Sequence, residues 1–306
     1  MLSSNIEQQR STHTARLPNF IILGACKSGT SGLYRDLARH PNAFLPSKKE
    51  PNILNTAKSS DDACRRYTCH FAGAPANSIV GEASTYYTMV PEITGSARLA
   101  SRLLPEQVRF VYIMRDPIKR IESQLAFEYA IGRLRHTDFD RAVREDPKYV
   151  HWSDYPRQLK PWFDHFHRDR FLFLKFENYA ANRLQVVREA ASFIGLNPHD
   201  VVPEEKVINT RGSHLRAHSP LLKRVIFSDR VMRKIVPKTP RIIKSLAKTA
   251  LTRKMPDVQP ELSAETLRFV EDRLGDVGQC LDAMGVHGFQ WPLPAHPDNS
   301  DHDSSS

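Results

Sequence analysis

Residues 20–34 read FIILGACKSGTSGLY, an apolar run that gives way to glycine, lysine, serine and threonine. The run at 20–24 has the composition of a buried strand, and the residues from Thr30 onward have that of a helix. A turn between a strand and a helix N-terminus presents backbone N–H groups where the helix dipole favours an anion. The stretch therefore predicts an α/β fold with a phosphate site at the end of its first strand.

The position of Lys27 decides which kind of phosphate loop this is. The P-loop of ATP and GTP enzymes runs G-x-x-x-x-G-K-[ST], with lysine directly after the second glycine. Here Lys27 comes two residues before Gly29. Gly29 lets the backbone approach a ligand closely, and Thr30 and Ser31 supply hydroxyls. Two interpretations stay open: a loop that grips a different nucleotide, and an ordinary turn with a solvated lysine.

A second stretch, VYIMRDPIKRIESQL at 111–125, repeats the strand-to-helix geometry. Asp116 is a suitable N-cap, and Pro117 at the first helical position loses no needed N–H. Ser123 lies two turns into the helix, so it returns to the face on which Arg115 leaves the strand. An arginine and a serine there can hold a second phosphate. The alternative is an arginine paired with Asp116 and a serine without function.

The rest of the chain alternates strands with helices, which is typical of a parallel sheet covered on both faces. We predict a P-loop-like three-layer α/β sandwich with a central, mainly parallel sheet of four to five strands, plus a helical C-terminal region. Its domain spans 18–291, between a flexible N-terminus at 1–17 and a disordered tail at 292–306. Strands are expected at 19–24, 78–81, 108–114 and 170–176, and helices at 30–40, 61–71, 91–104, 118–131, 155–168, 182–194 and 263–284, with only helix and loop after 203.

Composition narrows the class of protein. The chain has 306 residues, 40% hydrophobic and 25% charged, as in ordinary globular enzymes. Four scattered cysteines favour a reducing compartment over a disulfide framework. Cys64, Cys69 and His70 lack a second pair of ligands, so no metal is expected. No stretch approaches the ~18 apolar residues of a membrane span, and the N-terminus lacks the apolar segment of a secretory signal. We expect a cytoplasmic protein.

The net charge of +10 is concentrated in one segment, residues 215–254, called here the basic block. The block holds twelve Lys/Arg and one acidic residue, Asp229, while the remainder of the chain is nearly neutral. Three interpretations stay open: helices with solvated lysines, a lid that guides an anionic acceptor, and a peripheral contact with anionic lipid. Nucleic acid is not expected as a partner, because the charge has little aromatic interleaving and no binding motif is present.

The two strand-end motifs, in this order, resemble the sulfotransferases that use 3′-phosphoadenosine-5′-phosphosulfate (PAPS). In that family a lysine ahead of the glycine is the usual arrangement, the first loop holds the 5′-phosphosulfate, and the arginine and serine of the second motif hold the 3′-phosphate. A basic loop that closes over the nucleotide corresponds to NTRGSHLRAHSP at 209–220. The resemblance thus implies a PAPS site formed by Lys27, Ser28, Gly29, Thr30, Ser31, Arg115, Ser123, Arg211, Gly212 and Arg216.

Further segments extend the resemblance over roughly 18–220. SKKEPNIL at 47–54 is similar to a K-E-P segment of the carbohydrate-type and bacterial members, and VGEASTYYT at 80–88 to a G-E-x-[ST]-x-x-Y segment. In heparan-type relatives a glutamate matching Glu50 is the general base, so Glu50 is the expected base, with Glu82 in reserve. The alternative for Glu50 is a surface charge cluster. Lys49, Glu82, Tyr86 and Tyr87 are candidate contacts of the acceptor. The alternatives are a solvated lysine and aromatic rings that serve in packing.

The predicted chemistry is in-line transfer of a sulfuryl group from PAPS to an acceptor hydroxyl on a carbohydrate, glycolipid or small natural product. Negative charge grows on the bridging oxygen as the sulfuryl group leaves, and Lys27 is the catalytic cation expected beside it. The acceptor needs a general base, for which Glu50 is the candidate. The alternatives are a P-loop-like nucleotide kinase, which the position of Lys27 disfavours, and a non-catalytic polyanion-binding protein.

Overall fold

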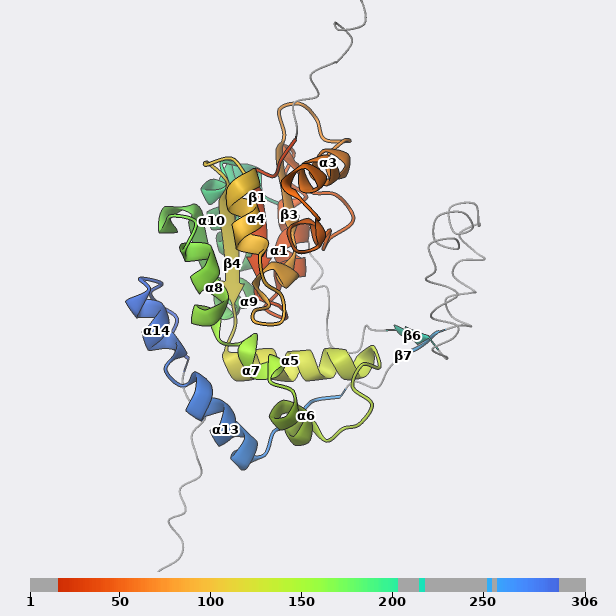
Figure 1. Cartoon of the computed structure of the whole chain (residues 1–306), viewed down its shortest axis with the longest axis vertical. Helices are drawn as coiled ribbons and strands as arrows, with labels where there is room; N and C mark the ends of the chain where they lie inside the picture. The colour runs from red at the N-terminus through yellow and green to blue at the C-terminus, as the bar shows by residue number, and fades with distance from the viewer. Residues whose placement is uncertain (1–15, 203–214, 218–251, 255–257, 292–306) are drawn as a thin grey trace, which may run out of the picture.

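A five-stranded parallel sheet forms the centre of the computed structural model, which describes residues 16–202, 215–217, 252–254 and 258–291 (Figure 1). The strand order is β2-β3-β1-β4-β5, and every pairing is parallel. The first strand is therefore central, which confirms the predicted sheet. The strands are β1 Phe20–Gly24, β2 Ala43–Phe44, β3 Ile79–Ala83, β4 Arg109–Met114 and β5 Phe171–Lys175.

A separate apolar core covers each face of the sheet. Along β1, Ile21 and Leu23 belong to one core while Phe20 and Ile22 belong to the other, as the period of two in a strand requires. The second core is closed by α1 Thr30–Leu37, α9 Phe176–Ala181 and α10 Arg183–Phe193. The first is closed by α2 Ile53–Thr56, α3 Ser60–His70, α4 Ser96–Leu103, α5 Pro117–Ala130, α6 Phe139–Glu145, α7 Lys148–His151, α8 Tyr155–Phe163, α13 Ala264–Leu274 and α14 Val277–Ala283.

Several element boundaries differ from the sequence prediction. The helix expected from 91 begins at Ser96, after the left-handed Gly95, and the helix expected to reach 168 ends at Phe163. The last strand ends at Lys175, because Phe176 already begins α9. The two-residue strand β2 and the short helices α6, α7 and α9 were not predicted, since segments this short carry little periodicity.

Two predictions about the C-terminal part are wrong. Two short strands, β6 Leu215–Ala217 and β7 Thr252–Lys254, pair antiparallel at the two ends of the basic block, where only helix and loop were expected. Local backbone pairing there overrides the helical composition. The single late helix is two helices, because Gly275 ends α13 and Asp276 is the N-cap of α14.

The N-terminus predicted to be flexible (apart from 16–17), the tail predicted to be disordered and residues 218–251 of the basic block, for which helix and loop were predicted, lie outside the described residues. The single domain over 18–291 stays a prediction. Among the helices that the structure describes, none is both long and apolar enough to cross a membrane.

The buried Asp36 carboxylate of α1 forms an ion pair with the half-buried Arg183 of α10 and a hydrogen bond with Tyr179 of α9. Asp36 is 1% exposed, and its carboxylate accepts hydrogen bonds from Arg183 at 2.7 and 2.8 Å and from the Tyr179 hydroxyl at 2.6 Å. Burial, and the Asp36 carboxylate beside it, raise the pKa of Tyr179. The cluster fixes the helix that follows the lysine loop, since Asp36 lies in the last turn of α1.

Replacing Asp36 with Asn should lower the free energy of unfolding by about 3 kcal/mol, because the Arg183 guanidinium loses a buried carboxylate. Urea denaturation followed by circular dichroism measures the change. Asp164→Asn, which removes a carboxylate from the exposed ion pair with Lys160, is the matched control and should cost about 0.5 kcal/mol. Equal losses in the two variants would contradict a structural role for Asp36.

Candidate functional site

The lysine loop, residues 25–29, lies between β1 and α1 at the carboxyl edge of the sheet. Lys27 and Gly29 both have left-handed backbone conformations, with φ of 68° and 90°. A Cβ on Gly29 would lie 2.8 Å from the Phe176 ring, and one on Gly32 would lie 2.6 Å from the Tyr179 hydroxyl. Glycine at 29 and 32 is therefore required for α1 and the loop before it to approach α9.

Lys27 points its side chain toward α5. Its ammonium lies 4.1 Å from the centre of the Phe127 ring. Burial lowers the pKa of Lys27, and the positive charges of Arg115, Arg120 and Lys49 lower it further. The lysine thus carries its charge in a partly dry, electropositive site, where an arriving anion gains most from it.

The second motif meets this loop through Arg115. Its guanidinium nitrogen lies 3.5 Å from the backbone oxygen of Lys27, and its carbon lies 4.7 Å from the centre of the Phe176 ring. The Tyr155 hydroxyl donates to the Arg115 carbonyl at 2.5 Å and accepts from its N–H at 3.2 Å. The two predicted phosphate motifs, from β1 and β4, therefore share one site.

The structure describes some of the remaining residues of the predicted nucleotide site. Asp116 caps α5 by accepting from the Lys119 N–H at 2.7 Å, as expected of the N-cap. Ser123 lies half-buried on α5. Ser28 and Thr30 are buried, and Ser31 is half-buried. Arg211 and Gly212 lie outside the described residues, and Arg216 is placed only by its backbone in β6, opposite Arg253.

Glu50 lies where β3 ends. Its N–H donates to the Ala83 carbonyl at 2.9 Å, and its carboxylate accepts from the Thr85 N–H at 2.9 Å. Lys49 forms an ion pair with the same carboxylate, whose side chain is 28% exposed. Glu50 is therefore oriented by its neighbours yet reachable from solvent, which a general base requires.

Glu82 and Tyr87 lie in a different environment. Glu82 is fully buried and accepts hydrogen bonds from the hydroxyls of Tyr67, Ser84 and Tyr87 at 2.7–2.8 Å. The Tyr87 oxygen also accepts from the backbone N–H groups of Ile53 and Leu54. These side chains are buried and satisfy one another's hydrogen bonds. Tyr86 is half-buried in the 3-10 turn that follows β3.

Three groups at this site were missed at the sequence level. Phe176 lies against both the lysine loop and Arg115. Phe127 lies under the Lys27 ammonium. Arg120, fully buried, donates to the Ser153 hydroxyl at 2.5 Å and to the Tyr149 carbonyl at 2.8 Å. Arg120 had a signal in the sequence, since it lies in RDPIKR at 115–120, one helical turn after the N-cap Asp116.

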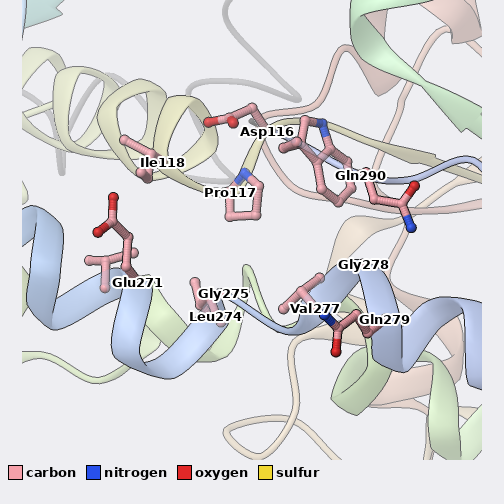
Figure 2. A pocket seen from close by; sticks show the side chains of 12 residues that line it. Asp116, Pro117, Ile118, Glu271, Leu274, Gly275, Val277, Gly278, Gln279 and Gln290 are labelled. Carbon is pink, nitrogen blue, oxygen red and sulfur yellow. The ribbon is translucent and has the colours of Figure 1, made fainter. Parts of the chain in front are cut away.

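A cavity of about 120 Å³ lies beside this site, between the start of α5 and the C-terminal helices (Figure 2). The predicted acceptor residues do not line it. Its walls include the carboxylates of Asp116 and Glu271, the Trp291 indole and apolar side chains of α13 and α14. Within the described residues, no group of three or more His, Cys, Asp or Glu side chains could hold a metal ion.

Comparison with known proteins identifies the family. The family model described as a sulfotransferase domain matches residues 17–238. This chain belongs to the sulfotransferase family. The match spans both phosphate motifs, the segment that carries Glu50 and β5, and it ends before α13.

Individual relatives of this sulfotransferase agree with that assignment. The membrane-associated sulfotransferase kil1 of Dictyostelium discoideum is 30% identical over 140 residues, which is 40% of this chain and 28% of that protein. This chain thus matches little more than a quarter of that relative's length. A crystal structure of a sulfotransferase from Alicyclobacillus acidocaldarius covers 89% of this chain, over 97% of its own, with 22% identity and a TM-score of 0.60, which shows the fold.

A further structural match is the mouse sulfotransferase SULT7A1, whose crystal structure is complexed with PAP. It covers 88% of this chain and 90% of its own length, with 13% identity and a TM-score of 0.43. At this distance the match carries no argument about the ligands of the present chain.

Glu82 should make stability depend on pH. Burial raises the pKa of Glu82 to about 7 from an ordinary value of 4.5. Because the folded state binds this proton more tightly than the unfolded state does, protonation of Glu82 stabilises the fold. This stabilisation is complete below about pH 4.5 and is lost as pH rises through 7. Between pH 5 and 8 the wild type should lose about 2.5 kcal/mol of unfolding free energy relative to Glu82→Gln.

Urea denaturation at a series of pH values measures both curves. Glu145→Gln, which removes an exposed carboxylate on α6, is the control and should follow the wild type. A constant difference between wild type and Glu82→Gln across this range would rule out the titration of Glu82.

Proposed function

We propose that this chain transfers a sulfuryl group from PAPS to a hydroxyl of an acceptor. The observation that carries the proposal is the contact between Arg115 and the Lys27 backbone, which joins two anion-binding motifs at neighbouring strand ends. A nucleotide with phosphate groups at both its 5′ and 3′ positions needs two such motifs at once. Membership of the sulfotransferase family supports the same substrate.

The lysine loop is the proposed site of the 5′-phosphosulfate. The N-terminus of α1 supplies backbone N–H groups, and Lys27, Ser28, Gly29, Thr30 and Ser31 line the loop. Glycine at 29 permits the left-handed turn, with φ of 90°, that leads the loop into the N-terminus of α1, where the phosphate is proposed to bind.

The second motif is the proposed site of the 3′-phosphate, through Arg115 and Ser123. Arginine presents two parallel N–H donors to a phosphate, which gives direction as well as charge. The Phe176 ring lies against both Arg115 and Gly29, so it keeps the second motif next to the lysine loop. Arg211, Gly212 and Arg216 stay proposed contacts from the chain segment near β6.

In the proposed reaction the acceptor oxygen forms a bond to sulfur while the bond from sulfur to the bridging oxygen breaks. The acceptor proton passes to Glu50, whose carboxylate is oriented by the Thr85 N–H. The electron pair of the broken bond stays on the bridging oxygen, and the Lys27 ammonium stabilises that charge. Adenosine 3′,5′-bisphosphate and the sulfate ester are the products.

The acceptor is proposed to be an alcohol on a carbohydrate, a glycolipid or a small natural product. Lys49 and Tyr86 lie at the same edge as Glu50 and are proposed acceptor contacts. Tyr87 and Glu82, being buried, are proposed to position the segment at 50–54 instead.

Location in the cell is also a proposal. We propose a cytoplasmic enzyme, because the free thiols of Cys26, Cys64, Cys69 and Cys280 suit a reducing compartment. The relative from Dictyostelium discoideum is described as membrane-associated. A peripheral contact of this chain with anionic lipid through the basic block is the corresponding proposal, and the middle of that block lies outside the described residues.

Binding of adenosine 3′,5′-bisphosphate should depend on Arg115. Calorimetry should give micromolar affinity of the wild type for adenosine 3′,5′-bisphosphate. The affinity should be at least tenfold lower for 5′-AMP, which lacks the 3′-phosphate, and at least tenfold lower for adenosine 3′,5′-bisphosphate in Arg115→Ala, since one charged contact contributes about 1.5–3 kcal/mol. Arg133→Ala, in the loop that follows α5, is the control and should bind as the wild type does. Preference for ATP with magnesium would instead favour the nucleotide kinase.

Glu50→Gln should lower kcat by about 10²–10⁴-fold and change KM for PAPS little, because the variant keeps the shape of the side chain but cannot accept a proton. A coupled assay for adenosine 3′,5′-bisphosphate release measures both constants with any acceptor that the wild type uses. Glu122→Gln on α5 is the control. A Glu50→Gln enzyme with wild-type kcat would exclude this residue as the base.

A further inference from the structure

One face of α5 packs against the lysine loop. Arg120, Gln124 and Phe127 recur at helical spacing on that face. The Gln124 side-chain oxygen accepts from the Cys26 thiol and from the Arg120 guanidinium, each at 3.4 Å. Phe127, one turn farther, lies under the Lys27 ammonium at 4.1 Å. The helix therefore holds the residue before Lys27 by a hydrogen bond and Lys27 itself by an aromatic ring.

The charges around Lys27 explain why a ring is a suitable partner. Arg115, Arg120 and Lys49 contribute positive charge, and the Cys26 thiol is the other titratable group next to it. Within the part of the chain that the structure describes, Lys27 forms no ion pair with a carboxylate. A carboxylate would bind the ammonium strongly and compete with an arriving phosphosulfate. The face of an aromatic ring stabilises the ammonium by only about 0.5–2 kcal/mol.

We propose that Phe127 is a positioning residue, whose ring holds the Lys27 ammonium in the nucleotide-free protein and releases it when the anionic end of the nucleotide enters the loop. The inference rests on the proposed function for the identity of that nucleotide. A full negative charge attracts an ammonium more strongly than the quadrupole of a ring does. Nucleotide entry thus moves Lys27 from α5 to the reacting group.

This arrangement has a measurable thermodynamic consequence. An interaction that exists only in the free protein opposes binding, so its removal tightens binding by the same free energy. Phe127→Leu should therefore bind adenosine 3′,5′-bisphosphate about 2–30-fold more tightly than the wild type. Phe127→Tyr keeps the ring and should bind like the wild type. Tyr129→Leu removes an aromatic ring elsewhere on α5, packed against Phe139, and is the control for helix stability.

Nuclear magnetic resonance tests the contact itself without any need for activity. The full chain is labelled with lysine carrying ¹³C at the ε position, and Lys27→Arg identifies the Lys27 signal. In the nucleotide-free wild type the ε protons should be shifted upfield by the Phe127 ring. The shift should persist in Phe127→Tyr and Tyr129→Leu, vanish in Phe127→Leu, and vanish in the wild type on addition of adenosine 3′,5′-bisphosphate.

Each failure has a distinct meaning. An ordinary Lys27 signal in the nucleotide-free wild type would overturn the inference, whatever the nucleotide result. An upfield signal that persists at saturating adenosine 3′,5′-bisphosphate, or weaker binding by Phe127→Leu with unchanged binding by Tyr129→Leu, would overturn the release step. A wild type that shows the upfield signal yet binds no adenosine nucleotide would contradict the proposed function and leave the contact between Phe127 and Lys27 established.

Discussion

The Tyr155 hydroxyl holds both backbone groups of Arg115, and the geometry of the carboxyl edge depends on that contact. Arg115 occupies the point at which β4 turns into α5, so the direction of its side chain and the start of α5 follow from it. Because β4 pairs with β1 on one side and β5 on the other, the contact also relates the lysine loop to Phe176. Burial raises the pKa of Tyr155 to about 12, so its hydroxyl remains a donor at physiological pH.

Buried polar groups at the end of β3 hold the segment that carries Glu50, the proposed general base. Glu82 binds the Tyr87 hydroxyl, which in turn receives the first N–H groups of α2. The Asn52 N–H donates to the Ser84 hydroxyl, and the Glu50 N–H donates to the end of β3. The segment that carries Glu50 is thus attached to β3 and its following turn at three points. Burial in this network disfavours the charged form of Glu82, so Glu82 keeps its proton to a higher pH than an exposed glutamate does.

The parts of this structure that could be predicted from the sequence are those encoded by local patterns. Apolar runs identified β1 and β4, and the residues after β4 identified the cap at Asp116. Phosphate binding by the two loops stays a prediction. The burial of Glu82 could not be predicted in this way, because it depends on Tyr67 from α3 and Tyr87 from the turn after β3. Phe127 and Phe176 were missed for a related reason: an aromatic residue at a helix position has the same pattern whether it faces a core or a lysine.

Gln290 and Trp291, in a segment that follows β5 by more than 100 residues, contact side chains at the carboxyl edge of the sheet. The Trp291 ring packs against Tyr155, and the Lys175 ammonium lies over the Trp291 ring and donates to the Gln290 carbonyl at 2.9 Å. Figure 1 shows α13 and α14, which lead to this segment, beside α5 and α8. During synthesis on the ribosome, β1, β4 and β5 all emerge before Trp291. The ring that packs against Tyr155 is therefore added after these three strands, and the edge reaches its final geometry only once Trp291 has been made.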